Sequence, residues 1–138
     1  MNAHVLLQKI MGCHIEIFTV CDAATIRNGF NIVGTYNTIN ADSYPVDHDF
    51  VVAVAVGFDV DDTGLHEIRV SLLDPDGQNV LPPYEIDYTI HGIQSIAPVS
   101  ENIWRFSARL PKFGDYMFQL RCDQKMIGEK TIYFQERE

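Results

Sequence analysis

The stretch LPKFGDYMFQLRCDQKMIGEKTIYF, residues 110–134, decides the fold class of this 138-residue chain. Gly114 marks a turn, because glycine adopts the backbone angles that tight turns need at little cost. After the turn, the apolar side chains of Tyr116, Phe118, Leu120 and Cys122 alternate with a second set, which consists of Asp115, Met117, Gln119 and Arg121. This is the period of a strand with one buried face. Residues 122–125 then reverse the chain and residues 126–134 return, so the stretch predicts a β-hairpin.

Tyr116 lies two residues after Gly114, where this strand begins. A tyrosine there is the local pattern of the tyrosine corner of immunoglobulin-like sandwiches, in which the hydroxyl bonds to the backbone a few residues upstream. Turn signals recur through the chain about every 8–12 residues, as in sandwiches and barrels. The other predicted strands are 14–20, 30–39, 50–58, 65–74, 78–81, 84–90 and 102–110. We predict an all-β, immunoglobulin-like β-sandwich of about eight antiparallel strands.

The length indicates a single domain that can bury a core without metal or disulfide support. We assign residues 14–138 to this domain and residues 1–13 to an N-terminal extension, for which a short helix is one interpretation. Met11 is a second candidate for the first residue. Lys9 and later charged residues interrupt the apolar runs, so the start does not resemble a signal peptide. No run approaches the roughly 20 apolar residues of a membrane span, and we predict no membrane partner.

The charge balance argues against nucleic acid as a partner. Ten Lys and Arg residues stand against nineteen Asp and Glu, and the net charge is -9. Binding to phosphate backbones needs clustered basic side chains, and here the basic residues are scattered singly.

The three cysteines, Cys13, Cys21 and Cys122, cannot all pair within one chain, and their spacing has no CxxC motif. We expect reduced thiols packed as small apolar side chains in a cytoplasmic protein. A bridge between Cys21 and Cys122 across the two sheets is the alternative. We predict no cofactor.

The stretch FVVAVAVGF, from Phe50 to Phe58, is apolar at odd and even positions alike. This is typical of a central strand covered on both faces, or of a strand at a subunit contact. Its four valines count against a helix. Because one opposing sheet covers only one face, we expect a second cover for the other. Residues 1–11 and a second subunit are the two candidates, and the latter predicts a symmetric homodimer.

Two groups of residues are candidates for binding a ligand. Asp59, Asp61 and Asp62 precede a glycine and offer hard oxygen ligands for calcium. The further ligands of an EF-hand loop do not follow, so a solvated turn is the simpler interpretation. Aromatic side chains near loops or an edge could stack on sugar rings; these are Tyr44, Tyr84 and Tyr88.

The sequence contains no recognisable catalytic arrangement. Its serines lie in no G-x-S-x-G motif and no glycine-rich phosphate loop is present. His48 is flanked by Asp47 and Asp49, but adjacent loop residues rarely converge on one metal ion. We predict that the protein is not an enzyme.

Several motifs in order suggest a family. They are FTVCDAA (18–24), NGFNIVGTY (28–36), HEIRVSLLDPDG (66–77) and LPKFGDY (110–116). The chain resembles an uncharacterised bacterial family of small proteins that open with Cys-Asp-x-Ala. The resemblance implies a cytosolic β-sandwich domain and brings no activity or site residues with it.

Together these observations favour a non-catalytic domain that has a structural role or binds another protein or itself. The alternative is a ligand-binding module for carbohydrate or calcium.

Overall fold

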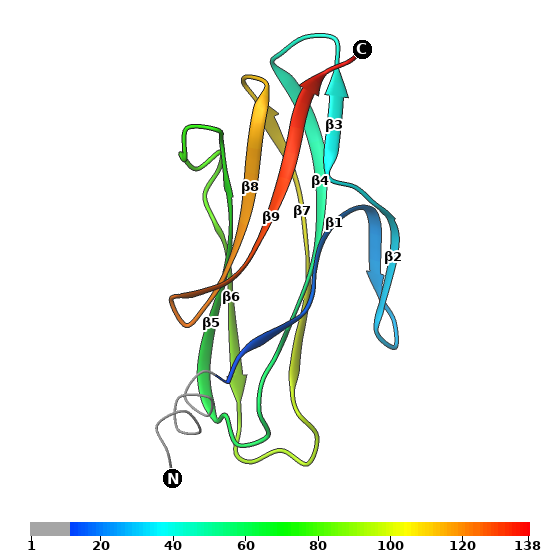
Figure 1. The fold of residues 1–138 in the computed structure, drawn as a ribbon. Helices are drawn as coiled ribbons and strands as arrows, with labels where there is room; N and C mark the ends of the chain where they lie inside the picture. Colours follow the sequence, from blue (N-terminus) through cyan, green and yellow to red (C-terminus); the bar gives the residue numbers. More distant parts are fainter. Residues whose placement is uncertain (1–11) are drawn as a thin grey trace, which may run out of the picture.

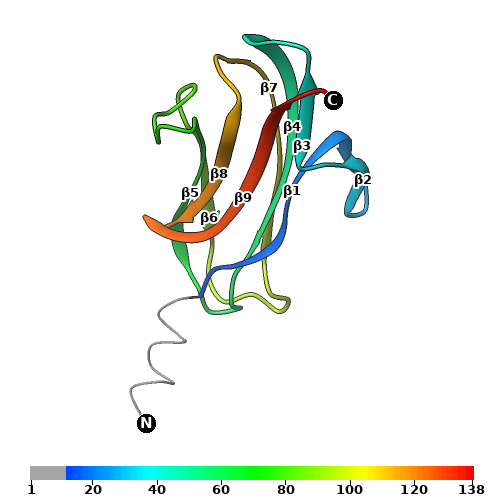
Figure 2. The ribbon, with the colours of Figure 1, turned by 45° about the horizontal axis from the view of Figure 1, so that its top comes forward.

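The computed structural model describes residues 12–138, and the regular elements among them are strands (Figure 1). The strands are β1 His14–Ile26, β2 Phe30–Thr35, β3 Thr38–Ala41, β4 Val46–Gly57, β5 Gly64–Leu73, β6 Tyr84–Ile90, β7 Val99–Leu110, β8 Gly114–Cys122 and β9 Lys125–Glu136. They form a four-stranded sheet in the order β2-β1-β4-β7 and a five-stranded sheet in the order β3-β9-β8-β5-β6. The two sheets face each other as a sandwich (Figures 1 and 2).

The prediction of an all-β, immunoglobulin-like sandwich is confirmed, with three corrections. One pair of strands, β3 and β9, is parallel. The segment 30–39, predicted as one strand, is divided between the sheets as β2 and β3. The chain crosses over at Tyr36 and Asn37: Tyr36 N still donates to Val20 O, whereas Asn37 O accepts from Tyr133 N. No regular strand forms at 78–81, where a single bridge joins Leu73 and Asn79.

The first strand is longer than its sequence pattern predicted. Residues 21–26, which lie beyond the predicted strand 14–20, continue β1 and pair with β2. The chain then reverses at Asn28 and Gly29, and both residues have positive φ, at 54° and 100°. An Asn-Gly pair in that conformation makes a tight hairpin, which keeps the preceding residues in the ladder.

The core lies between the sheets and contains the apolar face predicted for residues 116–122. Tyr116 and Phe118 are fully buried, and Trp104 is 8% exposed. The tyrosine corner is also present, because Tyr116 Oη donates a hydrogen bond of 2.8 Å to Lys112 O. That bond fixes the loop between β7 and β8 to the strand that follows it.

The outer face of β4 is covered by the chain itself. A small second cluster of buried residues forms there around Cys21, Ala24 and Ala53, with Phe30 and Ile32 of the β1–β2 region packed against it. Figure 1 shows β2 on the side of this sheet that faces away from the five-stranded sheet. Ala53 is fully buried as a result.

A hydrogen bond between β7 and β1 also spans the outer face of β4. Arg105 on β7 donates a hydrogen bond of 2.6 Å to Ala24 O, although β4 lies between the two strands. The expectation that β4 needs a cover from outside the domain is therefore wrong. The other candidate cover, residues 1–11, lies outside the described residues.

Among residues 12–138, no helix has the length and apolarity needed to cross a bilayer.

Candidate functional site

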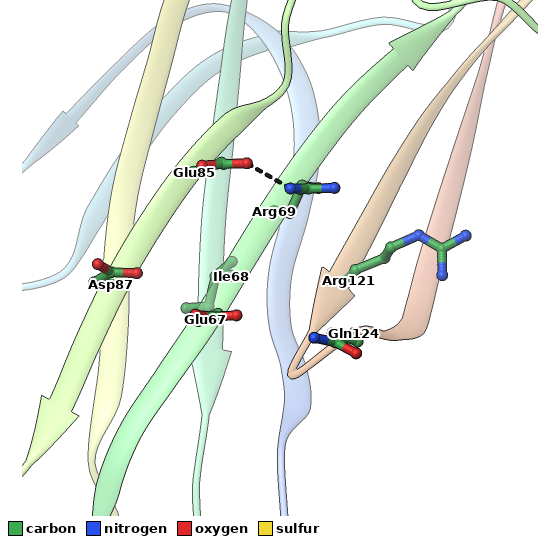
Figure 3. Close-up of a pocket in the computed structure, with 7 residues that line it drawn as sticks. All are labelled: Glu67, Ile68, Arg69, Glu85, Asp87, Arg121 and Gln124. Atoms are coloured by element: carbon green, nitrogen blue, oxygen red, sulfur yellow. Dashed lines mark hydrogen bonds and ion pairs between the residues drawn. The ribbon is translucent and has the colours of Figure 1, made fainter.

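The outer face of the five-stranded sheet is hollowed into a groove of about 440 Å³. We call it the charged groove, and its lining residues are Glu67, Ile68, Arg69, Glu85, Asp87, Arg121 and Gln124 (Figure 3). They come from β5, β6, β8 and the turn after β8. Because side chains alternate along a strand and Ile68 and Val70 point into the core, Glu67 and Arg69 project outward.

Like charges stand directly opposite each other in this groove. Glu67 of β5 is the register partner of Asp87 on β6, and Arg69 is the partner of Arg121 on β8. Directly opposed like charges destabilise a sheet. One ion pair is formed, 2.5 Å between Arg69 Nη2 and a carboxylate oxygen of Glu85.

The remaining charges of the groove have no ion-pair partner within residues 12–138. These are Glu67 and Asp87 on one side and Arg121 on the other. Figure 3 shows Arg121 beside Gln124, with the carboxylates of Glu67 and Asp87 across the groove from them. The groove therefore presents an anionic side and a cationic side.

The turn between β8 and β9 forms one border of the groove. Figures 1 and 2 show it curling outward past β5. Its two central residues, Asp123 and Gln124, have φ of 51° and 68°, a conformation in which Asn and Gly are preferred. Asp123 compensates by accepting from Glu67 N at 2.9 Å and bonding His66 Nδ1 at 2.7 Å. The border is thus fixed to β5.

The cysteines do not resemble catalytic nucleophiles. Burial raises the pKa of the Cys21 thiol, and burial together with the neighbouring Cys13 thiol raises the pKa of Cys122. A nucleophilic cysteine needs the opposite shift. All three cysteines are free thiols, and Cys21 and Cys122 belong to different clusters, so the alternative of a bridge between them is wrong.

The three predicted calcium ligands lie in the loop between β4 and β5 but do not converge. Asp59 and Asp61 accept backbone hydrogen bonds that shape the turn, and the backbone oxygen of Asp62 bonds His66 Nε2 at 2.9 Å. Within residues 12–138, their carboxylates belong to no group of three ligand atoms close enough to share an ion. The geometry agrees with a solvated turn.

The predicted aromatic platform is not assembled. Tyr84 and Tyr88 point from β6 toward the core, where Tyr84 stacks on Trp104 and Tyr88 on Phe58. Both rings are half-buried, because the outward positions of β6 belong to the residues between them. Tyr44 is 54% exposed and packs edge-on against Phe113.

The charged groove was not predicted from the sequence. The alternation in 65–74 does place Glu67 and Arg69 outside, but the opposition of Glu67 to Asp87 depends on the register between β5 and β6. That register is set by tertiary pairing, and no local signal in the sequence specifies it.

The sequence profile of one protein family matches residues 16–135. The chain belongs to this family of unknown function, DUF6941. The match agrees with the expectation of a family that has no assigned function. No curated protein matches the sequence of this DUF6941 chain.

Solved structures are similar to this DUF6941 member at low identity. An alkylpurine DNA glycosylase of Pseudomonas fluorescens, bound to DNA with an abasic-site analogue, has 7% identity and a TM-score of 0.50 over 90% of this chain and 30% of its own. A putative beta-galactosidase of Bacteroides fragilis has 14% identity and a TM-score of 0.44 over 87% and 15%. An immunoglobulin-like protein of Pseudomonas aeruginosa has 12% identity and a TM-score of 0.39 over 89% and 96%. This chain thus spans less than a third of the first two, and the likeness concerns the fold alone.

Proposed function

We propose that this chain is a non-catalytic interaction domain whose charged groove binds an extended segment of a protein partner. The segment carries a basic side chain that lies over Glu67 and Asp87 and an acidic side chain that meets Arg121. One observation carries the proposal: like charges lie directly opposite each other in this groove. Apart from the Arg69–Glu85 ion pair, the charged side chains of the groove have no ion-pair partner within residues 12–138.

The physical argument is that the opposed like charges lower the stability of the free sheet, whereas a bound ligand of opposite charge would remove their repulsion. A sheet gains nothing from Glu67 facing Asp87, and a sequence that breaks a local rule without a structural gain often does so at a functional site. A bound cation would remove the repulsion between these carboxylates. A bound carboxylate would do the same for Arg121 and Arg69, with Arg121 able to bind it through two parallel hydrogen bonds.

The chemistry of the lining favours a binding role over catalysis. The described residues that line the groove include no Ser, Thr, Cys or His side chain that could serve as a nucleophile or a base near neutral pH. They also include no aromatic ring on which a sugar could stack. This lining supports a peptide over carbohydrate as the ligand.

The partner in this proposal is a different protein and not a second copy of the chain. The homodimer expectation depended on an uncovered face of β4, and Ala53 on that face is fully buried. A net charge of -9 also makes two copies repel each other at long range. The three free thiols support a reducing compartment, and we propose that the protein acts in the cytoplasm.

The test is a nuclear magnetic resonance titration of the full chain with four synthetic peptides of equal length. One peptide has lysines in one half and glutamates in the other, and we call it the two-block peptide. The others are all-lysine, all-glutamate and a neutral Ser/Gly peptide. We expect the two-block peptide to bind most tightly, to shift amide signals of β5, β6 and the β8–β9 turn, and to weaken with added salt.

A matched pair of variants locates the site. Arg121→Gln should weaken binding of the two-block peptide by about tenfold, because a hydrogen bond to a charged group contributes roughly 1.5 kcal/mol or more. Arg109→Gln removes an exposed arginine on the other sheet and should leave binding unchanged. Equal binding of all four peptides, or equal effects of the two variants, would contradict the proposal.

A further inference from the structure

A group of metal-ligating side chains lies on the core side of the β8–β9 turn. The two sulfur atoms of Cys13 and Cys122 and a carboxylate oxygen of Asp123 all lie within 4.8 Å of one another. Cys122 is fully buried, Cys13 is half-buried and Asp123 is exposed. The three side chains come from the segment before β1, the end of β8 and the turn after it.

We propose that Cys13, Cys122 and Asp123 bind one zinc ion, with water as the fourth ligand. A tetrahedral zinc has Zn–S distances of about 2.3 Å, which place two sulfur ligands about 3.8 Å apart. The two sulfur atoms lie within 4.8 Å of each other, so they reach that value if they approach by about 1 Å or less. Two thiolates and one carboxylate favour zinc over calcium or magnesium, which take oxygen ligands.

The surroundings of Asp123 are those of a supported ligand. His66 is 7% exposed, and its Nδ1 bonds one carboxylate oxygen of Asp123 at 2.7 Å while its Nε2 bonds Asp62 O at 2.9 Å. The other oxygen of Asp123 accepts from Glu67 N. A hydrogen bond from histidine to a carboxylate ligand holds it in place. Each carboxylate oxygen retains a lone pair for the metal.

The segment before β1 packs closely beside the proposed zinc site. A Cβ on Gly12 would overlap Asp62 Oδ2, so glycine lets the chain pass this close to the β4–β5 loop without displacing that carboxylate. The next residue, Cys13, lies close to Cys122. Its partial exposure gives the ion a route from solvent.

Binding displaces the protons of the two thiols to solvent and forms two metal–sulfur bonds. Its consequence is structural: the ion ties the segment before β1 to the β8–β9 turn. The inference does not rest on the charged groove, since none of its three ligands lines that groove.

Cobalt(II) is the probe, because it takes the place of zinc and its thiolate complexes absorb light. The reduced, metal-free full chain is titrated with cobalt and then with zinc. We expect a thiolate-to-cobalt charge-transfer band that saturates at one cobalt per chain and disappears when zinc is added. Zinc should also raise the melting temperature, because it binds the native state, whereas calcium should not.

Three variants assign the ligands, and circular dichroism verifies that each is folded. Cys13→Ser should abolish the band, because it removes one of the two thiolate ligands. Asp123→Asn should weaken cobalt binding by about tenfold or more, the size of loss seen for residues that support a metal site. Cys21→Ser is the matched control, since this thiol lies in the outer cluster, and it should leave the band unchanged. The inference is overturned if the reduced chain shows no thiolate band, or if the band persists in Cys13→Ser.

Discussion

Replacing Tyr116 by Phe removes the hydroxyl of the tyrosine corner and leaves the aromatic ring in place. The hydroxyl donates to Lys112 O at 2.8 Å and accepts a longer, 3.4 Å hydrogen bond from Lys112 N. Tyr116 is 0% exposed, so water cannot readily replace these bonds. A net hydrogen bond contributes about 0.5–1.5 kcal/mol, and a buried group left without a partner costs about 1–3 kcal/mol. We therefore expect Tyr116→Phe to lower the free energy of unfolding by about 1–3 kcal/mol.

The assay is equilibrium unfolding in urea, and Tyr133→Phe is the control. Tyr133 is 42% exposed, and its hydroxyl has no hydrogen-bond partner among residues 12–138. The midpoint should fall for Tyr116→Phe with an unchanged slope, which indicates a loss of stability without a change in the surface exposed on unfolding. If both variants lose the same small amount, the corner does not stabilise this fold and the reasoning fails.

Three further predictions concern the core, the outer cover and acid stability. Trp104→Ala should lower the free energy of unfolding by about 3–5 kcal/mol, and a loss below about 1 kcal/mol in urea would contradict its place in the core. Ala53→Leu should cost about 1–3 kcal/mol through overpacking, whereas an unchanged melting temperature would mean that the outer face of β4 is open. Burial lowers the pKa of His48 against the opposing effect of Asp49. The unfolded chain therefore binds the proton more readily, and stability should fall as the pH drops below about 6.5. His48→Gln should reduce this fall, and identical pH profiles for the two proteins would refute the assignment.

The sequence predicted the architecture because its signals are local. The alternation after Gly114 and the position of Tyr116 are properties of a few adjacent residues, and so is the Asn28-Gly29 reversal. The break at Tyr36 could not be predicted in the same way, since β-branched residues continue on both sides of it. Only pairing with two different sheets divides that segment.

The candidate sites could not be predicted from the sequence, because they depend on contacts between residues that are distant along the chain. Cys13 and Cys122 are more than a hundred positions apart, and their proximity follows from the route of the chain around the sandwich. The pairing of Glu67 with Asp87 requires the register of β5 and β6. Clusters that do appear in the sequence, such as Asp59 with Asp61, form a turn.

The proposal that the charged groove binds an extended peptide is tested most directly by the orientation of the bound two-block peptide. A spin label on its acidic end should broaden amide signals of the β8–β9 turn, near Arg121, more than those of β6. A label on its basic end should broaden signals of β6, near Asp87, more strongly. In the double variant Arg121→Glu with Asp87→Lys, the two patterns should exchange. Patterns that do not exchange, or broadening that lies outside the groove, would contradict the proposal.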